Sequence, residues 1–359
     1  MKDQNKWLVA LHMTLCAGII GLVGVFVWAG LGSMALASIL VAVILLGLVF
    51  LLRSLGWFAK DRFSSARWLR ITGTVILMII VVLFSIGGLV YSVQDEMFFL
   101  NVDDQESRDL LQGKPGYSEI EFVAANGKTY HGMMYQAVAE EALEEQASSK
   151  TEKTPLIIYF GGNGECSFLR MRTLEESGDL QYCAGYSYMF VDYEGYGLNA
   201  GHASYQNIYE GALAVYDYAV SLPFVDENHI VTMGYSLGTG AAVYLAANRP
   251  VAGLILAAPY ANGHDLYNNM LPVFIGPMRL LEKQKLPSDK YAPAVTCPTL
   301  IFASLSDEVV PYESSKRLSQ LISGELEFIT LQDAKHSGIF SADGAYQSLQ
   351  SFLEGVAAE

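Results

Sequence analysis

The sequence predicts an α/β fold, a mostly parallel sheet with helices on both faces, preceded by three transmembrane helices. Three observations predict it. From residue 155 onward, short apolar runs alternate with longer helix-like stretches, as in a parallel sheet. The turn Gly234-Tyr235-Ser236-Leu237-Gly238 joins one such run to a stretch rich in small residues. Long apolar segments dominate the first 93 residues.

The apolar segments at residues 7–29, 33–52 and 71–93 are each long enough to cross a bilayer. About 20 residues at ~1.5 Å per residue span a ~30 Å hydrocarbon core. A cleaved signal peptide is the alternative for the first segment. This segment is too long for the apolar region of an ordinary signal peptide, and a second apolar segment follows at once. We therefore predict a membrane domain over residues 1–93.

Basic residues indicate the orientation of this domain. The loop 53–70 carries five basic residues and one acidic residue, and Lys2 and Lys6 flank the first segment. The positive-inside rule places both regions in the cytoplasm. We expect a multi-pass protein of the cell membrane, with a linker at 94–116 and an extracytoplasmic domain at 117–359.

The charge and the cysteines exclude several classes of function. The chain has a net charge of −15, and the residues after 92 carry 35 acidic and 15 basic side chains. Such an acidic domain argues against nucleic-acid binding. The four cysteines of the chain lack metal-ligand spacing, so neither a metal nor another cofactor is expected. Disulfide pairing among Cys166, Cys183 and Cys297 stays open, as does the oligomeric state.

The second domain begins with a predicted hairpin. Residues 119–123 and 129–135 read as strands around Asn126-Gly127, a strong two-residue turn signal. The Glu-rich stretch 139–153 is predicted to be a solvated insertion. Further strands are expected at 156–160, 188–191, 229–233, 253–258, 299–303 and 326–331, and helices at 165–177, 206–221, 239–247, 312–322 and 342–356.

A long excursion, residues 259–298, interrupts this alternation. Its apolar residues either pack on the sheet or form a lid that lines an acyl pocket, because loops of this length are often functional. These residues include Leu266, Tyr267, Met270, Leu271, Val273, Phe274, Ile275, Met278, Leu280 and Leu281.

The turn around Ser236 is typical of a nucleophile elbow. A Gly-x-Ser-x-Gly motif between a strand and a helix forces the serine into a strained turn, with its hydroxyl above the sheet. A chance Gly/Ser turn is the alternative, but this strand-helix context favours the nucleophile.

A serine nucleophile needs a histidine base and an acid to orient it. His336 follows the last predicted strand, whereas His264 precedes any suitable acid. The predicted acid is Asp307, at the end of the strand 299–303, although its neighbour Glu308 could take the role after a one-residue shift. Asp333 lies too near His336 in the sequence.

The oxyanion hole is expected to use the Leu237 N–H and one N–H from the loop Gly161-Gly162-Asn163-Gly164-Glu165. Asn163 is the first candidate for this second donor, and Gly162 is the next. As a phosphate-binding loop the stretch is weak, because it lacks the Lys-Ser/Thr pair of a P-loop.

With these motifs, residues 117–355 resemble an α/β-hydrolase, and most closely the membrane-anchored serine hydrolases that include acyl-protein thioesterases and lysophospholipases. The stretches that carry the resemblance are Tyr159-Phe160-Gly161-Gly162-Asn163-Gly164, Val191-Asp192-Tyr193-Glu194-Gly195-Tyr196-Gly197, the elbow, and Cys297-Pro298-Thr299-Leu300-Ile301 leading to Asp307, Val310 and Pro311.

Three positions depart from the pattern of this family. Gly161 replaces its loop histidine, Glu194 replaces its usual arginine, and Ser304 replaces the glycine before the acid. None of these changes touches the predicted triad. Asp192 is expected to be structural, tying its own loop together.

The resemblance and the motifs together imply a membrane-anchored serine hydrolase that cleaves an acyl ester or thioester, with small-molecule or lipid acyl substrates. A serine peptidase of the same fold is one alternative. A hydrolase-fold binding or sensor domain without catalysis is the other, and the altered oxyanion loop is its only support.

Overall fold

The computed structural model describes residues 98–137, 153–183, 185–270 and 274–358, with isolated positions at 47, 72, 75, 76, 79, 91, 94 and 95. The chain divides into two compact units, one of residues 1–98 with 276–283, the other of residues 99–275 with 284–359. The predicted spans 7–29, 33–52 and 71–93 lie outside the described residues except at isolated positions. Within the described part of the chain, no helix has the length and apolar character needed to cross a membrane.

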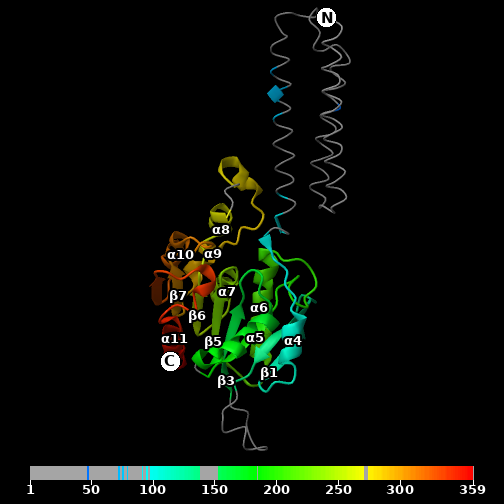
Figure 1. Cartoon of the computed structure of the whole chain (residues 1–359), viewed down its shortest axis with the longest axis vertical. Coiled ribbons are helices and arrows are strands. Elements are labelled where there is room, and N and C mark those ends of the chain that lie inside the picture. The colour runs from blue at the N-terminus through cyan, green and yellow to red at the C-terminus, as the bar shows by residue number, and fades with distance from the viewer. Residues whose placement is uncertain are drawn as a thin grey trace, which may run out of the picture. The chain divides into compact units, whose positions relative to one another are not determined.

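The second unit is built on an eight-stranded sheet with the order β1-β2-β4-β3-β5-β6-β7-β8 (Figure 1). β1 and β2 form an antiparallel hairpin, β2 runs antiparallel to β4, and all later pairs are parallel. The strands are β1 (Tyr117–Val123), β2 (Thr129–Tyr135), β3 (Thr154–Phe160), β4 (Ser187–Val191), β5 (Val225–Tyr235), β6 (Gly253–Ala257), β7 (Thr299–Ser304) and β8 (Leu326–Leu331).

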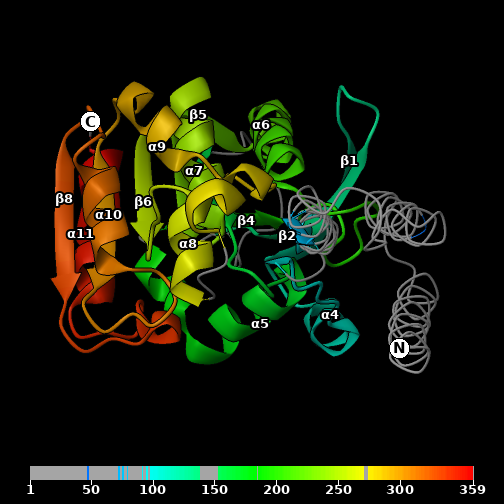
Figure 2. The same ribbon diagram turned by 90° about the horizontal axis from the view of Figure 1, so that it is seen from above.

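Helices cover both faces of this sheet, and Figure 2 shows α5 and α6 on opposite sides of it. The α-helices are α4 (Gln105–Leu111), α5 (Ser167–Ser177), α6 (Tyr205–Ser221), α7 (Gly238–Asn248), α8 (Gly263–Met270), α9 (Ser288–Tyr291), α10 (Tyr312–Ser319) and α11 (Ala345–Ala357). Short 3-10 helices are η3 (Asp179–Cys183), η4 (Gly276–Leu281), η5 (Ala292–Ala294) and η6 (His336–Gly338), of which η4 belongs to the first unit.

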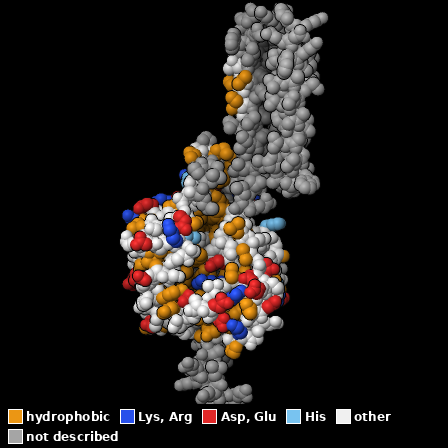
Figure 3. All heavy atoms as spheres, in the orientation of Figure 1, with side chains coloured by type: hydrophobic (Ala, Val, Ile, Leu, Met, Phe, Trp, Pro, Cys, Tyr) orange, Lys and Arg blue, Asp and Glu red, His pale blue; other side chains and the backbone are white. Residues whose placement is uncertain are grey.

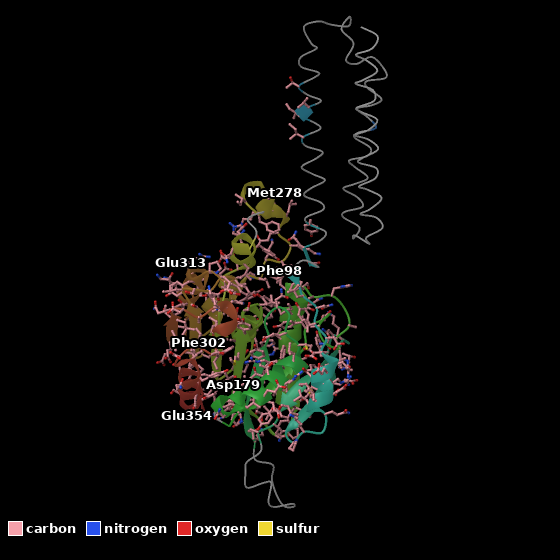
Figure 4. All side chains as sticks on the ribbon, viewed as in Figure 1. Phe98, Asp179, Met278, Phe302, Glu313 and Glu354 are labelled. Atoms are coloured by element: carbon pink, nitrogen blue, oxygen red, sulfur yellow. The ribbon has the colours of Figure 1, made fainter. Side chains whose placement is uncertain are left out.

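The central strands form the core. Every residue of β6 and β7 is buried, which explains why these strands read as continuous apolar runs rather than as alternating ones. Phe302, labelled in Figure 4, lies in β7 and meets the ring of Phe340 edge to face at 6.4 Å. Carboxylates are spread over the visible face of this unit in Figure 3. The predicted parallel, doubly covered sheet is therefore confirmed.

The observed elements differ from the predicted ones mainly at their ends. β5 begins at Val225, four residues before the predicted strand, and α10 ends at Ser319, three residues before the predicted helix end. The predicted linker 94–116 contains α4, and the second compact unit begins at residue 99 rather than at 117.

The excursion 259–298 is partly helical and its apolar residues have different environments. Leu266, Tyr267 and Phe274 are buried, and the rings of Tyr267 and Phe274 pack edge to face at 5.2 Å. Ile275 and Leu280 are exposed. The side chains of Met270, Leu271 and Val273 lie outside the described residues. Packing on the second unit thus accounts for part of the apolar set, and the lid stays a prediction for the rest.

Asp192 follows β4 and ties two loops together. Its carboxylate accepts hydrogen bonds from the Ser167 N–H at 2.6 Å and from the Ser167 hydroxyl at 2.8 Å, and so holds the start of α5. The side-chain amide of Asn199 donates to its backbone carbonyl. Burial raises the pKa of Asp192 to about 7, although the bonds from Ser167 favour the charged form.

This raised pKa predicts a stability that depends on pH. An acid whose pKa is higher in the folded chain binds more protons there, so its contribution is greatest below about pH 4 and is lost as the pH rises to about 7. Asp192→Asn can keep the bond from the Ser167 N–H through its amide oxygen, and its NH2 group can donate to the Ser167 hydroxyl in a bond of reversed direction. The substitution also removes the buried charge. We expect the Tm of this variant, relative to wild type, to increase by a few degrees between pH 5 and pH 8. Thermal unfolding of the full chain at both pH values measures this. The exposed Asp109→Asn is the matched control, and an Asp192→Asn variant that loses more stability at pH 8 than at pH 5 would contradict the assignment.

Candidate active site

Ser236 stands in a sharp turn between β5 and α7. Its φ is +49°, a conformation that costs a non-glycine residue about 1–3 kcal/mol unless its surroundings impose it. The glycines of the motif, Gly234 and Gly238, allow the surroundings to impose this conformation. A Cβ on Gly234 would lie 2.7 Å from the Gly238 carbonyl oxygen, and a Cβ on Gly238 would lie 2.0 Å from the Phe160 carbonyl oxygen. Only glycine at both positions lets strand and helix approach closely enough to hold Ser236 in this turn.

His336 and Asp307 extend from Ser236 in one hydrogen-bonded line. The Nε2 atom of His336 lies 2.9 Å from Ser236 Oγ. On the other side of the ring, Nδ1 lies 2.9 and 3.0 Å from the two carboxylate oxygens of Asp307. Asp307 follows β7 and His336 begins η6 after β8, so the parallel sheet brings their loops to one edge.

The Asp307 carboxylate is held in place by its own loop. Its side chain is only 1% exposed, and its Oδ1 accepts hydrogen bonds from the N–H groups of Val309 at 2.8 Å and Val310 at 2.9 Å. These two backbone donors orient the carboxylate toward the imidazole before any substrate arrives.

The competing sequence candidates lie elsewhere. Glu308 is exposed, and its carboxylate accepts a hydrogen bond from the His336 backbone N–H at 3.3 Å rather than from the ring. Asp333 is exposed. The ring of His264 lies beside the Asn268 amide within α8. Of the acids considered, the structure places Asp307 against Nδ1 of His336.

Tyr235, the residue before the predicted nucleophile, contacts two of the site's loops. Its hydroxyl donates to the His336 carbonyl at 3.0 Å, and its ring packs on the imidazole with centroids 5.2 Å apart. A Cβ on Gly162 would lie 2.9 Å from the same ring. The sequence does not indicate this role, because the variable position of a Gly-x-Ser-x-Gly motif accepts many residue types.

The predicted oxyanion donors differ in their surroundings. Within the described residues, the Leu237 N–H makes no hydrogen bond, and it lies at the start of α7. The Gly162 N–H donates to the Glu165 carboxylate at 2.7 Å, so this group is engaged within the loop. Because the Gly162 N–H already donates to the Glu165 carboxylate, Asn163 stays the first of the two loop candidates.

The side chain of Asn163 fastens the loop to its neighbours. Its Oδ1 accepts hydrogen bonds from the Leu100 N–H at 2.8 Å and from the Tyr196 hydroxyl at 2.7 Å. Tyr196 belongs to the stretch that carries the family resemblance, and this could have suggested a role for it. Leu100 contributes only a backbone N–H, which no sequence pattern reveals.

The described residues contain no group of three or more His, Cys, Asp or Glu side chains that could hold a metal ion. Cys166, Cys183 and Cys297 are free thiols, which settles the pairing that the sequence left open. Burial raises the pKa of the Cys166 thiol to about 11, so this thiol is not a reactive nucleophile at neutral pH.

Comparisons with known proteins agree with this geometry. The Mycobacterium tuberculosis protein MT2364 is 31% identical over 190 residues, covering 53% of this chain and 66% of its own length. The Caenorhabditis elegans alpha/beta hydrolase domain-containing protein aho-3 is 28% identical over 172 residues, covering 48% of this chain and 49% of its own. The chain thus matches between half and just under two thirds of these relatives. The structure of Est1E from Butyrivibrio proteoclasticus superposes with a TM-score of 0.51 at 19% identity, covering 67% of this chain and 99% of Est1E.

A family comparison covers the site itself. Residues 177–358 match the prolyl oligopeptidase family, a stretch that contains Ser236, Asp307 and His336 and makes up half of the chain. The match, the parallel sheet and the elbow agree with one another, and the chain therefore belongs to the prolyl oligopeptidase family of the α/β-hydrolase superfamily.

Proposed function

We propose that this protein is a membrane-anchored serine hydrolase that cleaves an acyl ester or thioester. The observation that carries the proposal is the hydrogen-bonded line from Ser236 Oγ through His336 to Asp307. Hydrolase activity of the ester or peptide kind is common to the family to which the chain belongs.

The chemistry follows from this line. Ser236 Oγ attacks the carbonyl carbon while its proton passes to Nε2 of His336, and Asp307 stabilises the resulting imidazolium through Nδ1–H. The carbonyl electrons move onto the oxygen, which the N–H groups of Leu237 and Asn163 stabilise. When the tetrahedral intermediate collapses, the leaving group takes the proton from Nε2. Water then attacks the acyl-enzyme by the same route.

Peptide cleavage is the second candidate, and the family match favours it. The same triad cleaves both kinds of bond, so the difference lies in how substrate is bound beside Ser236. Turnover of an acyl ester and of the matching p-nitroanilide under the same conditions separates the two. A binding or sensor domain without catalysis is the remaining alternative.

Membrane attachment is the third part of the proposal. It rests on the apolar segments 7–29, 33–52 and 71–93. A domain held close to a bilayer can receive lipid-derived acyl substrates directly, and the exposed Ile275 of the excursion offers apolar surface to such a chain.

The triad assignment predicts a specific pattern of losses. Ser236→Ala should abolish labelling by a fluorophosphonate probe. His336→Ala and Asp307→Asn should each lower kcat on the order of 10⁴-fold, because His336 takes the Ser236 proton and Asp307 orients its ring and stabilises the imidazolium. Glu308→Gln, the matched control, should change kcat little, since the side chain of Glu308 bonds only the backbone of His336. A small loss of kcat in Asp307→Asn together with a large loss in Glu308→Gln would show that Glu308, and not Asp307, is the acid of the triad. Absence of labelling in wild type would favour the binding domain.

The lid hypothesis predicts a preference for long acyl chains. We expect kcat/KM for p-nitrophenyl esters to rise from two carbons toward medium or long chains, and Ile275→Ser to reduce this rise. Ile275 is 65% exposed, so a serine at this position should not disturb folding. A serine at the buried position of Phe274 would disturb it. Leu110→Ser, which is exposed on α4, is the control. Fastest turnover of the acetyl ester, unchanged in Ile275→Ser, would rule out an acyl pocket in the excursion.

The basic loop 53–70 predicts that the hydrolase unit lies outside the cytoplasm. Protease added to intact cells or spheroplasts should therefore cleave within the insertion 139–153. The measurement is an immunoblot against the C-terminus before and after lysis. Cleavage that occurs only in inverted vesicles would reverse the orientation.

A further inference from the structure

Glu165 closes the predicted oxyanion loop with both its backbone and its side chain, which each form a hydrogen bond with Gly162. Its own N–H donates to the Gly162 carbonyl at 3.2 Å, and its carboxylate accepts the Gly162 N–H at 2.7 Å. The same carboxylate oxygen accepts the hydroxyl of Tyr159 at 2.9 Å. Tyr159 is fully buried in β3, so the carboxylate ties the loop to a rigid strand of the sheet.

The turn that Glu165 closes presents Asn163 at its second position. Gly164, at the third position, has a φ of +83°, as a type II turn requires. In such a turn the N–H of the second residue takes no part in the closing bond. The two bonds between Glu165 and Gly162 therefore fix the direction of the Asn163 N–H.

Position 161 has no room for a residue larger than glycine. A Cβ there would lie 2.5 Å from the ring of Phe190 and 3.0 Å from the Glu165 carboxylate. The Phe190 ring and the carboxylate thus fill the volume that a side chain at position 161 would need. The loop is supported by Glu165 from within.

A carboxylate near a developing oxyanion would oppose it unless its charge were offset. The Tyr159 hydroxyl and the Gly162 N–H both donate to it, and the guanidinium of Arg170 lies over the Tyr159 ring, 4.8 Å from its centroid. These groups draw the negative charge toward the sheet. The carboxylate can therefore shape the loop with little repulsion of the oxyanion.

We infer that Glu165 is a positioning residue for acyl transfer, which holds the Asn163 N–H in the direction that stabilises the oxyanion. This inference rests on the proposed hydrolase function. Glu165 acts through the loop, because the hydrogen bonds described for its carboxylate go to Tyr159 and Gly162.

The test compares two substitutions at one position. Glu165→Ala removes the acceptor, and we expect kcat to fall on the order of 10²-fold, as when one oxyanion donor is lost, with KM changed by no more than about threefold. The Ki of phenylboronic acid, which forms a tetrahedral adduct with an active serine, should rise by about the same factor as kcat falls. Glu165→Gln keeps an acceptor for the Gly162 N–H and should restore most of kcat. Glu176→Ala, on the exposed side of α5, is the matched control and should leave kcat and Ki unchanged.

Hydrogen exchange of the full chain provides a readout that needs no turnover. Amides of residues 160–166 should exchange faster in Glu165→Ala than in wild type, and Glu165→Gln should stay close to wild type. Equal kcat in Glu165→Ala and wild type, or equal losses in the Gln and Ala variants with unchanged exchange, would overturn the inference. Failure of the hydrolase proposal looks different, because wild type itself would then resist fluorophosphonate labelling while the exchange difference persisted.

Discussion

The site depends on one steric constraint, the close approach of β5 and α7 around Ser236. The serine has a backbone conformation that is unfavourable for its residue type, and its N–H donates to the Ala257 carbonyl at 2.9 Å. The cost is met by packing, because Gly234 and Gly238 bring the helix against the Phe160 carbonyl at the end of β3. Since β3 and β5 are paired at this point, with Phe160 opposite Gly234, the sheet itself defines the position of Ser236.

The neighbouring loops take their positions from this elbow. The Tyr235 hydroxyl donates to the His336 carbonyl, and the Tyr235 ring leaves no room for a side chain at Gly162. One residue next to Ser236 therefore contacts both the start of η6 and the loop 161–165. Asp307 is oriented independently, by the N–H groups of its own turn. The imidazole of His336 thus lies between Ser236 and Asp307, and each of these two residues is positioned by its own turn.

Much of this arrangement could be predicted from the sequence, because its strongest signals are local. Apolar runs of strand length predicted the parallel sheet, and the order Ser236, Asp307, His336 predicted which loops meet. The choice between Asp307 and Glu308 needed coordinates, since adjacent residues on a loop point in different directions. The roles of Glu165 and Tyr235 also could not be predicted from the sequence. Their roles depend on contacts with residues such as Gly162 and His336, and no periodicity records such contacts.

The segment after residue 98 shows why the predicted boundary at 117 differs from the observed one. Composition marks this stretch as a polar linker, yet Phe99 is buried and the Leu100 N–H bonds the side chain of Asn163. The Val102 carbonyl likewise accepts the Gly197 N–H, in the loop that supplies Tyr196 to the same asparagine. The segment 99–102 contributes only backbone groups to these two bonds, so almost any sequence in this segment could form them. The residues that follow the predicted membrane domain therefore support the loop that contains Asn163, and the second compact unit begins with them.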